Sequence, residues 1–133
     1  MDVISHGLWG GAAFGRKKTF WLVFGISIMP DVLSFGIFWL LTGLGVGGAP
    51  KWGDGHMNNA LIPVYVHTLY NITHSLVIFG LVFLIVFLIR RKPFWPMAAW
   101  GLHILIDIST HSEKFFPTPF LWPVSDFYIS GIS

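Results

Sequence analysis

Cysteine is absent from this chain of 133 residues, and charged residues make up only 11% of it. Without cysteine there is no disulfide framework and no thiolate ligand for a metal. A soluble domain carries about a quarter charged residues, so the composition excludes an ordinary soluble protein. The chain also has no internal repeat, which weighs against a transporter built from inverted repeats within one chain.

Hydrophobic residues, in contrast, make up 54% of the chain and aromatic residues 17%, with a mean hydropathy of +0.70. This composition is typical of an integral membrane protein. We predict an all-α fold in one domain, residues 1–133, as an integral membrane bundle of about four helices. The first helix is short, about 20 Å at 1.5 Å per residue. The expected segments are 2–15, 19–44, 63–89 and 93–110.

Smaller features refine this outline. Gly7, Gly11 and Gly15 recur every four residues and predict a smooth face on which another helix packs closely. Pro30 precedes Asp31 inside the second segment, where proline predicts a kink and a free carbonyl beside a carboxylate. Residues 43–59 are rich in glycine and predict a loop over the outer end of the bundle. The tail, residues 115–133, is rich in proline and aromatics and predicts a strap rather than a fifth span.

Six of the eight basic residues form two clusters, Arg16–Lys18 and Arg90–Lys92, each bordering an apolar segment. Such clusters mark the cytoplasmic side of a membrane protein better than they mark a nucleic-acid site. We therefore expect a multi-pass protein with both clusters on the cytoplasmic side. Its expected partner is the lipid bilayer, with no nucleic acid.

Five residues that bind metals well lie inside the apolar segments, where hydrocarbon tolerates polar groups only when they are paired, wetted or bound to an ion. Counted along helices from the nearest basic cluster, all five lie roughly 15 to 24 Å from the cytoplasmic border. Groups at one depth on four segments predict one shared site. The five residues are His6, Asp31, His74, His103 and Asp107.

The donor types narrow the chemistry of this site. Imidazole and carboxylate without thiolate suit zinc, manganese or iron(II), and zinc is favoured where no redox chemistry occurs. The number of donors exceeds one tetrahedral zinc with a water, so two ions are plausible. By the same count along the chain, His67 and His111 lie nearer the outer surface. They are candidates for outer ligands or for the acid that protonates a leaving group.

Three functions agree with these residues. The first is a membrane-embedded zinc hydrolase, in which activated water attacks an ester or phosphoester of a lipid or other amphiphile. The second is a divalent-ion or proton transporter, or a channel subunit, in which a homo-oligomer supplies the missing repeats. The third is a structural interaction protein with a satisfied polar core, in which both aspartates would have to be protonated.

Several short motifs follow one another along nearly the whole chain: His6-Gly7, Pro30-Asp31, His67 with Thr73-His74-Ser75, His103 with Asp107 and Thr110-His111, and Leu121-Trp122-Pro123. Their order and spacing resemble those of the inner-membrane metal-dependent hydrolases, also described as LexA-binding inner-membrane hydrolases. The resemblance implies a small bacterial protein of the cytoplasmic membrane with hydrolase activity. It adds His67 to the metal ligands, giving the set His6, Asp31, His67, His74, His103 and Asp107. One departure is that Thr68-Leu69 follows His67, where the family often has Arg-Gly, so a basic group that could hold an anion is missing.

Overall fold

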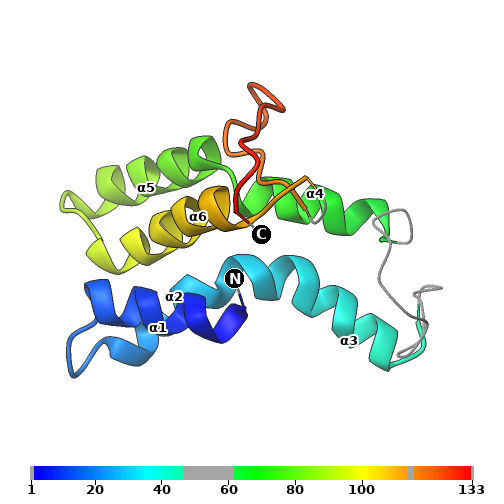
Figure 1. Cartoon of the computed structure of the whole chain (residues 1–133). Coiled ribbons are helices and arrows are strands. Elements are labelled where there is room, and N and C mark those ends of the chain that lie inside the picture. The colour runs from blue at the N-terminus through cyan, green and yellow to red at the C-terminus, as the bar shows by residue number, and fades with distance from the viewer. Residues whose placement is uncertain (1, 47–61, 114–115, 133) are drawn as a thin grey trace.

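The computed structural model describes residues 2–46, 62–113 and 116–132, and within these ranges the regular structure is entirely helical. This confirms the predicted all-α class. Most of the predicted glycine-rich loop, residues 43–59, lies outside the described residues. The helices, shown in Figure 1, are α1 (Val3–Phe14), α2 (Phe20–Asp31), the π-helical turn η1 (Val32–Gly36), α3 (Ile37–Gly43), α4 (Val64–Thr73), α5 (Leu76–Arg90), the 3-10 turn η3 (Trp95–Met97) and α6 (Ala98–Thr110).

Helix α1 begins at Asp2, whose carboxylate accepts hydrogen bonds from the Ser5 amide at 2.9 Å and the Ser5 hydroxyl at 2.6 Å. These bonds satisfy a free amide of the first turn and lower the pKa of Asp2. Glycines then bring α1 against α2, as predicted. A methyl group at Gly7 would collide with Phe24, and one at Gly11 would collide with Phe20.

The second predicted segment forms one continuous helical run through α2, η1 and α3. Pro30 removes one backbone donor from this run, and the widened π turn follows directly after Asp31. The Pro30 carbonyl accepts a hydrogen bond from the Ser34 hydroxyl at 2.9 Å, and the Thr73 hydroxyl of α4 lies 3.3 Å from the same carbonyl oxygen. The proline therefore leaves an irregular turn that side chains stabilise, and the helix does not end there.

The third segment differs from the prediction of one helix over 63–89. It breaks after Thr73, and α4 and α5 meet at an angle of 55°. Ser75 caps α5 by accepting hydrogen bonds from the amides of Val77 and Ile78, each at 3.1 Å. Carbonyl groups of the C-terminal tail also bind here, since Trp122 accepts from the Ser75 hydroxyl and Phe120 accepts from the Leu76 amide at 2.8 Å. Apolar periodicity could not show this break, because a distant part of the chain stabilises it.

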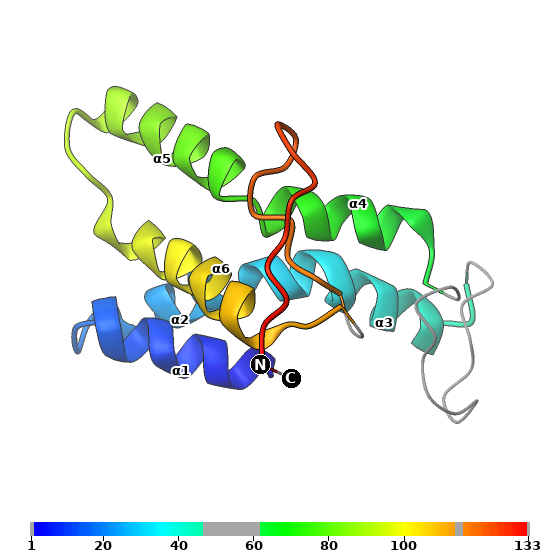
Figure 2. The ribbon, with the colours of Figure 1, turned by 45° about the horizontal axis from the view of Figure 1, so that its top comes forward.

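The fourth segment forms η3 and α6, and the described part of the tail, residues 116–132, is non-helical as predicted. The tail crosses beside α4 and returns to the end of α6 (Figure 2). There the Gly131 amide donates to the His111 carbonyl at 2.7 Å and the Ile132 amide to that of Ser109 at 3.0 Å. The connections that carry Arg16–Lys18 and Arg90–Lys92 lie at one end of the molecule in both views.

The prediction of about four membrane spans is not confirmed. Within the described residues, one helix, Phe20–Gly43, is long and apolar enough to cross a bilayer. The bent pair α4 and α5 passes the same criterion only when it is taken together. Helices α1 and α6, with 12 and 13 residues, are too short, because a full span needs about 20 residues. A multi-pass position in an inner membrane is therefore not supported by helix length.

Candidate metal centre

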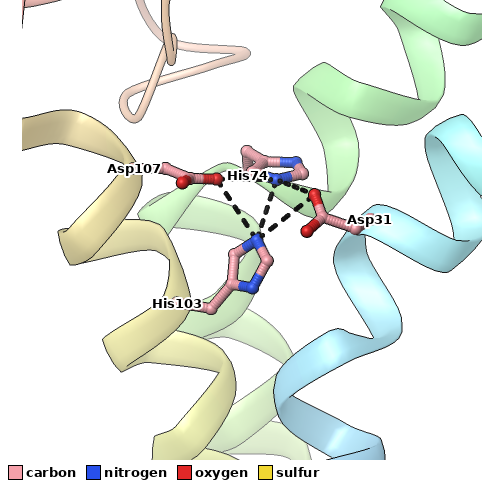
Figure 3. Close-up of side chains that lie close together, drawn as sticks. All are labelled: Asp31, His74, His103 and Asp107. Atoms are coloured by element: carbon pink, nitrogen blue, oxygen red, sulfur yellow. Dashed lines mark hydrogen bonds and ion pairs between the residues drawn. The ribbon is translucent and has the colours of Figure 1, made fainter. Parts of the chain in front are cut away.

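Four buried side chains from three separate parts of the chain converge at the centre of the fold (Figure 3). Asp31 ends α2, His74 caps α4, and His103 and Asp107 lie one turn apart on α6. One potential ligand atom from each lies within 4.8 Å of all the others. The predicted convergence is thus confirmed for these four residues, which together could hold a metal ion.

Hydrogen bonds on the far side of each imidazole fix where its proton lies. The Nδ1 atom of His103 is 2.7 Å from the Ser27 carbonyl oxygen, which can only accept. The Nδ1 atom of His74 is 3.1 Å from the Tyr70 carbonyl and 3.0 Å from the hydroxyl of Thr73, whose own proton is donated to the Leu69 carbonyl at 2.8 Å. Both Nδ1 atoms therefore carry a hydrogen, as in many metal sites where the second nitrogen orients the ring.

The two Nε2 atoms, left bare when the rings are neutral, face each other at 3.0 Å. Two lone pairs at this distance repel each other, and two carboxylates face them. Asp107 Oδ2 is 3.3 Å from each Nε2 atom, and Asp31 Oδ1 is 3.5 Å from that of His74 and 3.6 Å from that of His103. A cation between the four atoms relieves this repulsion and compensates the buried negative charge.

The spacing of these atoms fits a tetrahedral ion. Zinc bonds of about 2.0–2.1 Å place neighbouring ligand atoms roughly 3.3 Å apart in a tetrahedron. Five of the six separations between the ligand atoms run from 3.0 to 3.6 Å, and the sixth, between the two carboxylates, is within 4.8 Å. The residues present therefore fit a divalent metal ion in both donor type and geometry.

His6, the fifth residue predicted from the apolar segments, lies against this group from the other side of Asp107. Its Nε2 atom is 2.9 Å from Asp107 Oδ1, and its ring stacks on His103 with centroids 3.8 Å apart. The hydroxyl of Ser27 donates to the His6 carbonyl at 2.6 Å and anchors this part of α1. His6 thus contacts the second oxygen of a carboxylate whose first oxygen faces the cluster.

His111 approaches the same oxygen, with its Nε2 atom 3.4 Å from Asp107 Oδ1. Its Nδ1 atom is 2.8 Å from the hydroxyl of Tyr70, which is itself 3.0 Å from the Thr118 hydroxyl of the tail. The Tyr70 ring also stacks on His74 at 3.8 Å. Tyr70 therefore touches both a cluster histidine and His111.

The structure does not bring His67 into this group. Its ring stacks on Phe116, with centroids 4.6 Å apart, and lines a separate cavity near the surface. The resemblance placed His67 among the ligands on the spacing of the family motif. Because the chain breaks at His74, that residue turns to the centre while His67 stays with the face of α4 that meets the tail.

Sequence reasoning missed the residues that orient the ligands: Ser27, Tyr70 and Thr73. Their signal in the sequence is weak, because each is a common residue within an apolar helix. Only the position of Thr73 and Ser75, directly on either side of His74, indicated a polar setting.

Comparisons with protein families, with curated proteins and with solved structures find no match. The function must be inferred from the site. The finding that stands is a buried group of two aspartates and two histidines that could bind a divalent metal.

Proposed function

We propose that this chain is a membrane-embedded, zinc-dependent hydrolase that cleaves an ester or phosphoester of a lipid or other amphiphile. The observation that carries the proposal is the pair of Nε2 atoms of His74 and His103, 3.0 Å apart and flanked by two carboxylates. Zinc is favoured because the donors are nitrogen and oxygen, five of the six ligand-atom separations are close to those of a tetrahedron, and the chain has no cysteine to supply a thiolate. Bound zinc supplies a Lewis acid that polarises an ester or phosphoryl oxygen and acidifies water.

The chain's own residues have separate tasks in this proposal. Asp31, His74, His103 and Asp107 bind the ion, and the carbonyls of Ser27 and Tyr70 hold the two imidazole rings in place. His6 and His111 face the outer oxygen of Asp107, at 2.9 and 3.4 Å. They are placed to bind a second ion there, or to move a proton to or from the reacting groups.

Of the two histidines predicted to transfer protons, His111 has the stronger claim. It contacts Asp107 directly, whereas the His67 ring is stacked on Phe116 outside the cluster. The hydroxyl of Tyr70, 2.8 Å from Nδ1 of His111, fixes the direction of the His111 ring. Tyr70 is thus a positioning residue.

The exposed apolar surface of the protein supports a lipid or amphiphilic substrate in this proposal. Helix α5 has no buried residue, and large apolar side chains are exposed along it, including Leu81, Leu84 and Leu88. Such a surface is stable in lipid and unstable in water. A substrate dissolved in the bilayer would reach the protein from the side.

One observation favours the second function, ion transport. Four protein ligands fill a tetrahedral zinc site, whereas catalytic zinc sites usually keep one position open. A hydrolase needs a free position for water, so the ion would have to accept a fifth ligand, or a second ion would have to bind beside Asp107 Oδ1. An ion that is only bound and released has no such requirement.

The test is metal analysis and turnover of the purified full-length protein in lipid nanodiscs. We expect stoichiometric zinc in the wild type and in His67→Ala, and loss of zinc in His103→Ala. The histidine in the first variant lies outside the cluster and serves as the matched control. Zinc-dependent release of product from phospholipids or phosphate esters supports the hydrolase, and ion flux in liposomes without turnover supports the transporter. Absence of any bound transition metal in a folded wild type rejects the hydrolase and the divalent-ion transporter.

A further inference from the structure

A second polar site lies between α4 and the C-terminal tail, outside the metal centre. It is a cavity of about 220 Å³, open to the surface. Tyr70 and Phe116, whose rings pack edge to face with centroids 5.1 Å apart, separate it from the buried cluster. The residues that line it and matter here are His67, Asn71, Phe116, Asp126 and Tyr128.

Four of these side chains are polar, and the structure shows no hydrogen-bond partner for their polar groups among the described residues. Within the described parts of the chain, His67, Asn71, Asp126 and Tyr128 make no side-chain hydrogen bond or ion pair. The tail brings Asp126 and Tyr128 to this place from more than 50 positions along the chain beyond His67 and Asn71. Polar groups that converge on a cavity without bonding one another are available to a ligand.

Charge and ring content define which ligand fits. Among the described residues that line the cavity, Asp126 is the carboxylate and none is an arginine or a lysine. The basic clusters of the described chain, Arg16–Lys18 and Arg90–Lys92, lie at the opposite end of the helices. The cavity also has the aromatic rings of Phe116 and Tyr128 in its wall. A carboxylate beside aromatic rings attracts an ammonium group through charge and through cation–π contact.

We propose that this cavity binds a primary or quaternary ammonium group, with Asp126 as the counter-charge and the ring of Tyr128 as the aromatic face that the cation contacts. The volume is below the roughly 300–1000 Å³ of sites for drug-sized ligands, so it suits a headgroup rather than acyl chains. If the ammonium group is part of the hydrolase substrate, this proposal rests on the proposed function. If it belongs to another ligand, the ammonium site is independent of the hydrolase. The rings of Tyr70 and Phe116 would then separate the headgroup of an ammonium lipid held here from the metal centre.

The first experiment measures binding of choline and ethanolamine to the full-length protein in nanodiscs of anionic lipid, by calorimetry. Asp126→Asn removes the charge and keeps the shape of the side chain. We expect this variant to bind choline and ethanolamine at least about fivefold more weakly than the wild type. Glu113→Gln is the matched control, since it removes an exposed carboxylate that does not line the cavity, and it leaves binding unchanged. Equal binding to wild type and Asp126→Asn overturns the proposal, as does equal binding of 3,3-dimethylbutanol, the uncharged shape analogue of choline.

A second pair of variants tests the aromatic wall. Tyr128→Phe keeps the ring and should bind choline as the wild type does, whereas Tyr128→Leu should bind it several-fold more weakly. Equal binding by all three overturns the role of the ring. Nanodiscs with phosphatidylethanolamine or phosphatidylcholine, compared with phosphatidylglycerol, then separate the two sources. Lipid that competes with soluble choline identifies a lipid headgroup, and failure to compete identifies a free amine.

Zinc content is measured on the same samples. Loss of ammonium binding in Asp126→Asn with zinc retained concerns the cavity alone. If the wild type holds no zinc but binds choline through Asp126, the proposed hydrolase activity is rejected and the proposed ammonium site is supported.

Discussion

Two long apolar segments, α2 to α3 and α4 to α5, are each interrupted next to a residue of the metal cluster. The first contains Pro30 before Asp31 and yet continues as one helical run of 24 residues. The second contains no proline within its helices and bends by 55° beside His74. The residue known for breaking helices is therefore in the segment that does not break.

The difference lies in what receives the freed backbone groups. At Pro30, a π turn and the hydroxyls of Ser34 and Thr73 satisfy the irregular turn within a continuing helix. At Ser75, the carbonyls of Phe120 and Trp122 arrive from the tail and make a complete break stable. Both interruptions direct a ligand side chain to the metal cluster: Asp31 directly before the π turn, and His74 at the end of α4.

The largest effect is expected from removing the two ligands at these interruptions. Asp31→Ala and His74→Ala should each lower zinc affinity by more than about 100-fold, because each removes a direct donor where loss of a supporting contact alone costs 10–100-fold. Competition with a chelator of known affinity measures this. Retention of wild-type affinity by either variant would show that its interruption does not serve the metal site.

The next largest effect is expected from removing the hydroxyl group at each interruption, Ser75 at the break and Ser34 in the π turn. Ser75→Ala removes the N-cap of α5 and a bond to the tail, and should lower the free energy of unfolding by about 1–2 kcal/mol. Ser34→Ala is the matched change in the π turn and should cost about 1 kcal/mol or less, because its hydroxyl bonds only carbonyls of its own helix. Unfolding in mixed detergent micelles measures both. Equal losses of unfolding free energy in the two variants would contradict the conclusion that the Ser75 cap and the tail stabilise the break.

Thr73 joins the two interruptions, since its hydroxyl is 3.3 Å from the Pro30 carbonyl and 3.0 Å from Nδ1 of His74. Thr73→Val preserves the shape and should cost about 1 kcal/mol of unfolding free energy. We also expect weaker zinc binding, because the His74 ring loses one of its two contacts at Nδ1. Thr68→Val, at an exposed position of the same helix, is the control and should change neither quantity.

The smallest effect is expected from Pro30→Ala. The new amide can restore one helical hydrogen bond, and the carbonyl of residue 30 keeps its hydrogen bond from Ser34 and its contact with the Thr73 hydroxyl. Stability should change by less than about 1 kcal/mol, with zinc content unchanged. A clear loss of zinc in this variant, measured by elemental analysis, would show that the proline itself places Asp31.

Much of the fold followed from composition and periodicity. The all-helical class, the bounds of α1 and the non-helical tail were predicted within a few residues, because apolar runs, glycine spacing and proline content act locally. The break at His74 was not predicted, since Leu76 begins a run of apolar residues that favours a helix on its own. Four spans were predicted, but only Phe20–Gly43 has the required length and composition by itself.

The candidate site divides in the same way. Asp31, His74, His103 and Asp107 could be selected from the sequence because ionisable groups are costly in apolar segments, so few are present. Their separations of 3.0–3.6 Å and the orientation of the imidazoles depend on carbonyls of Ser27 and Tyr70, which no residue pattern identifies. The tertiary structure likewise decided that His67 faces a surface cavity with Asp126, because the tail and the bend of α4 against α5 meet only in the folded chain.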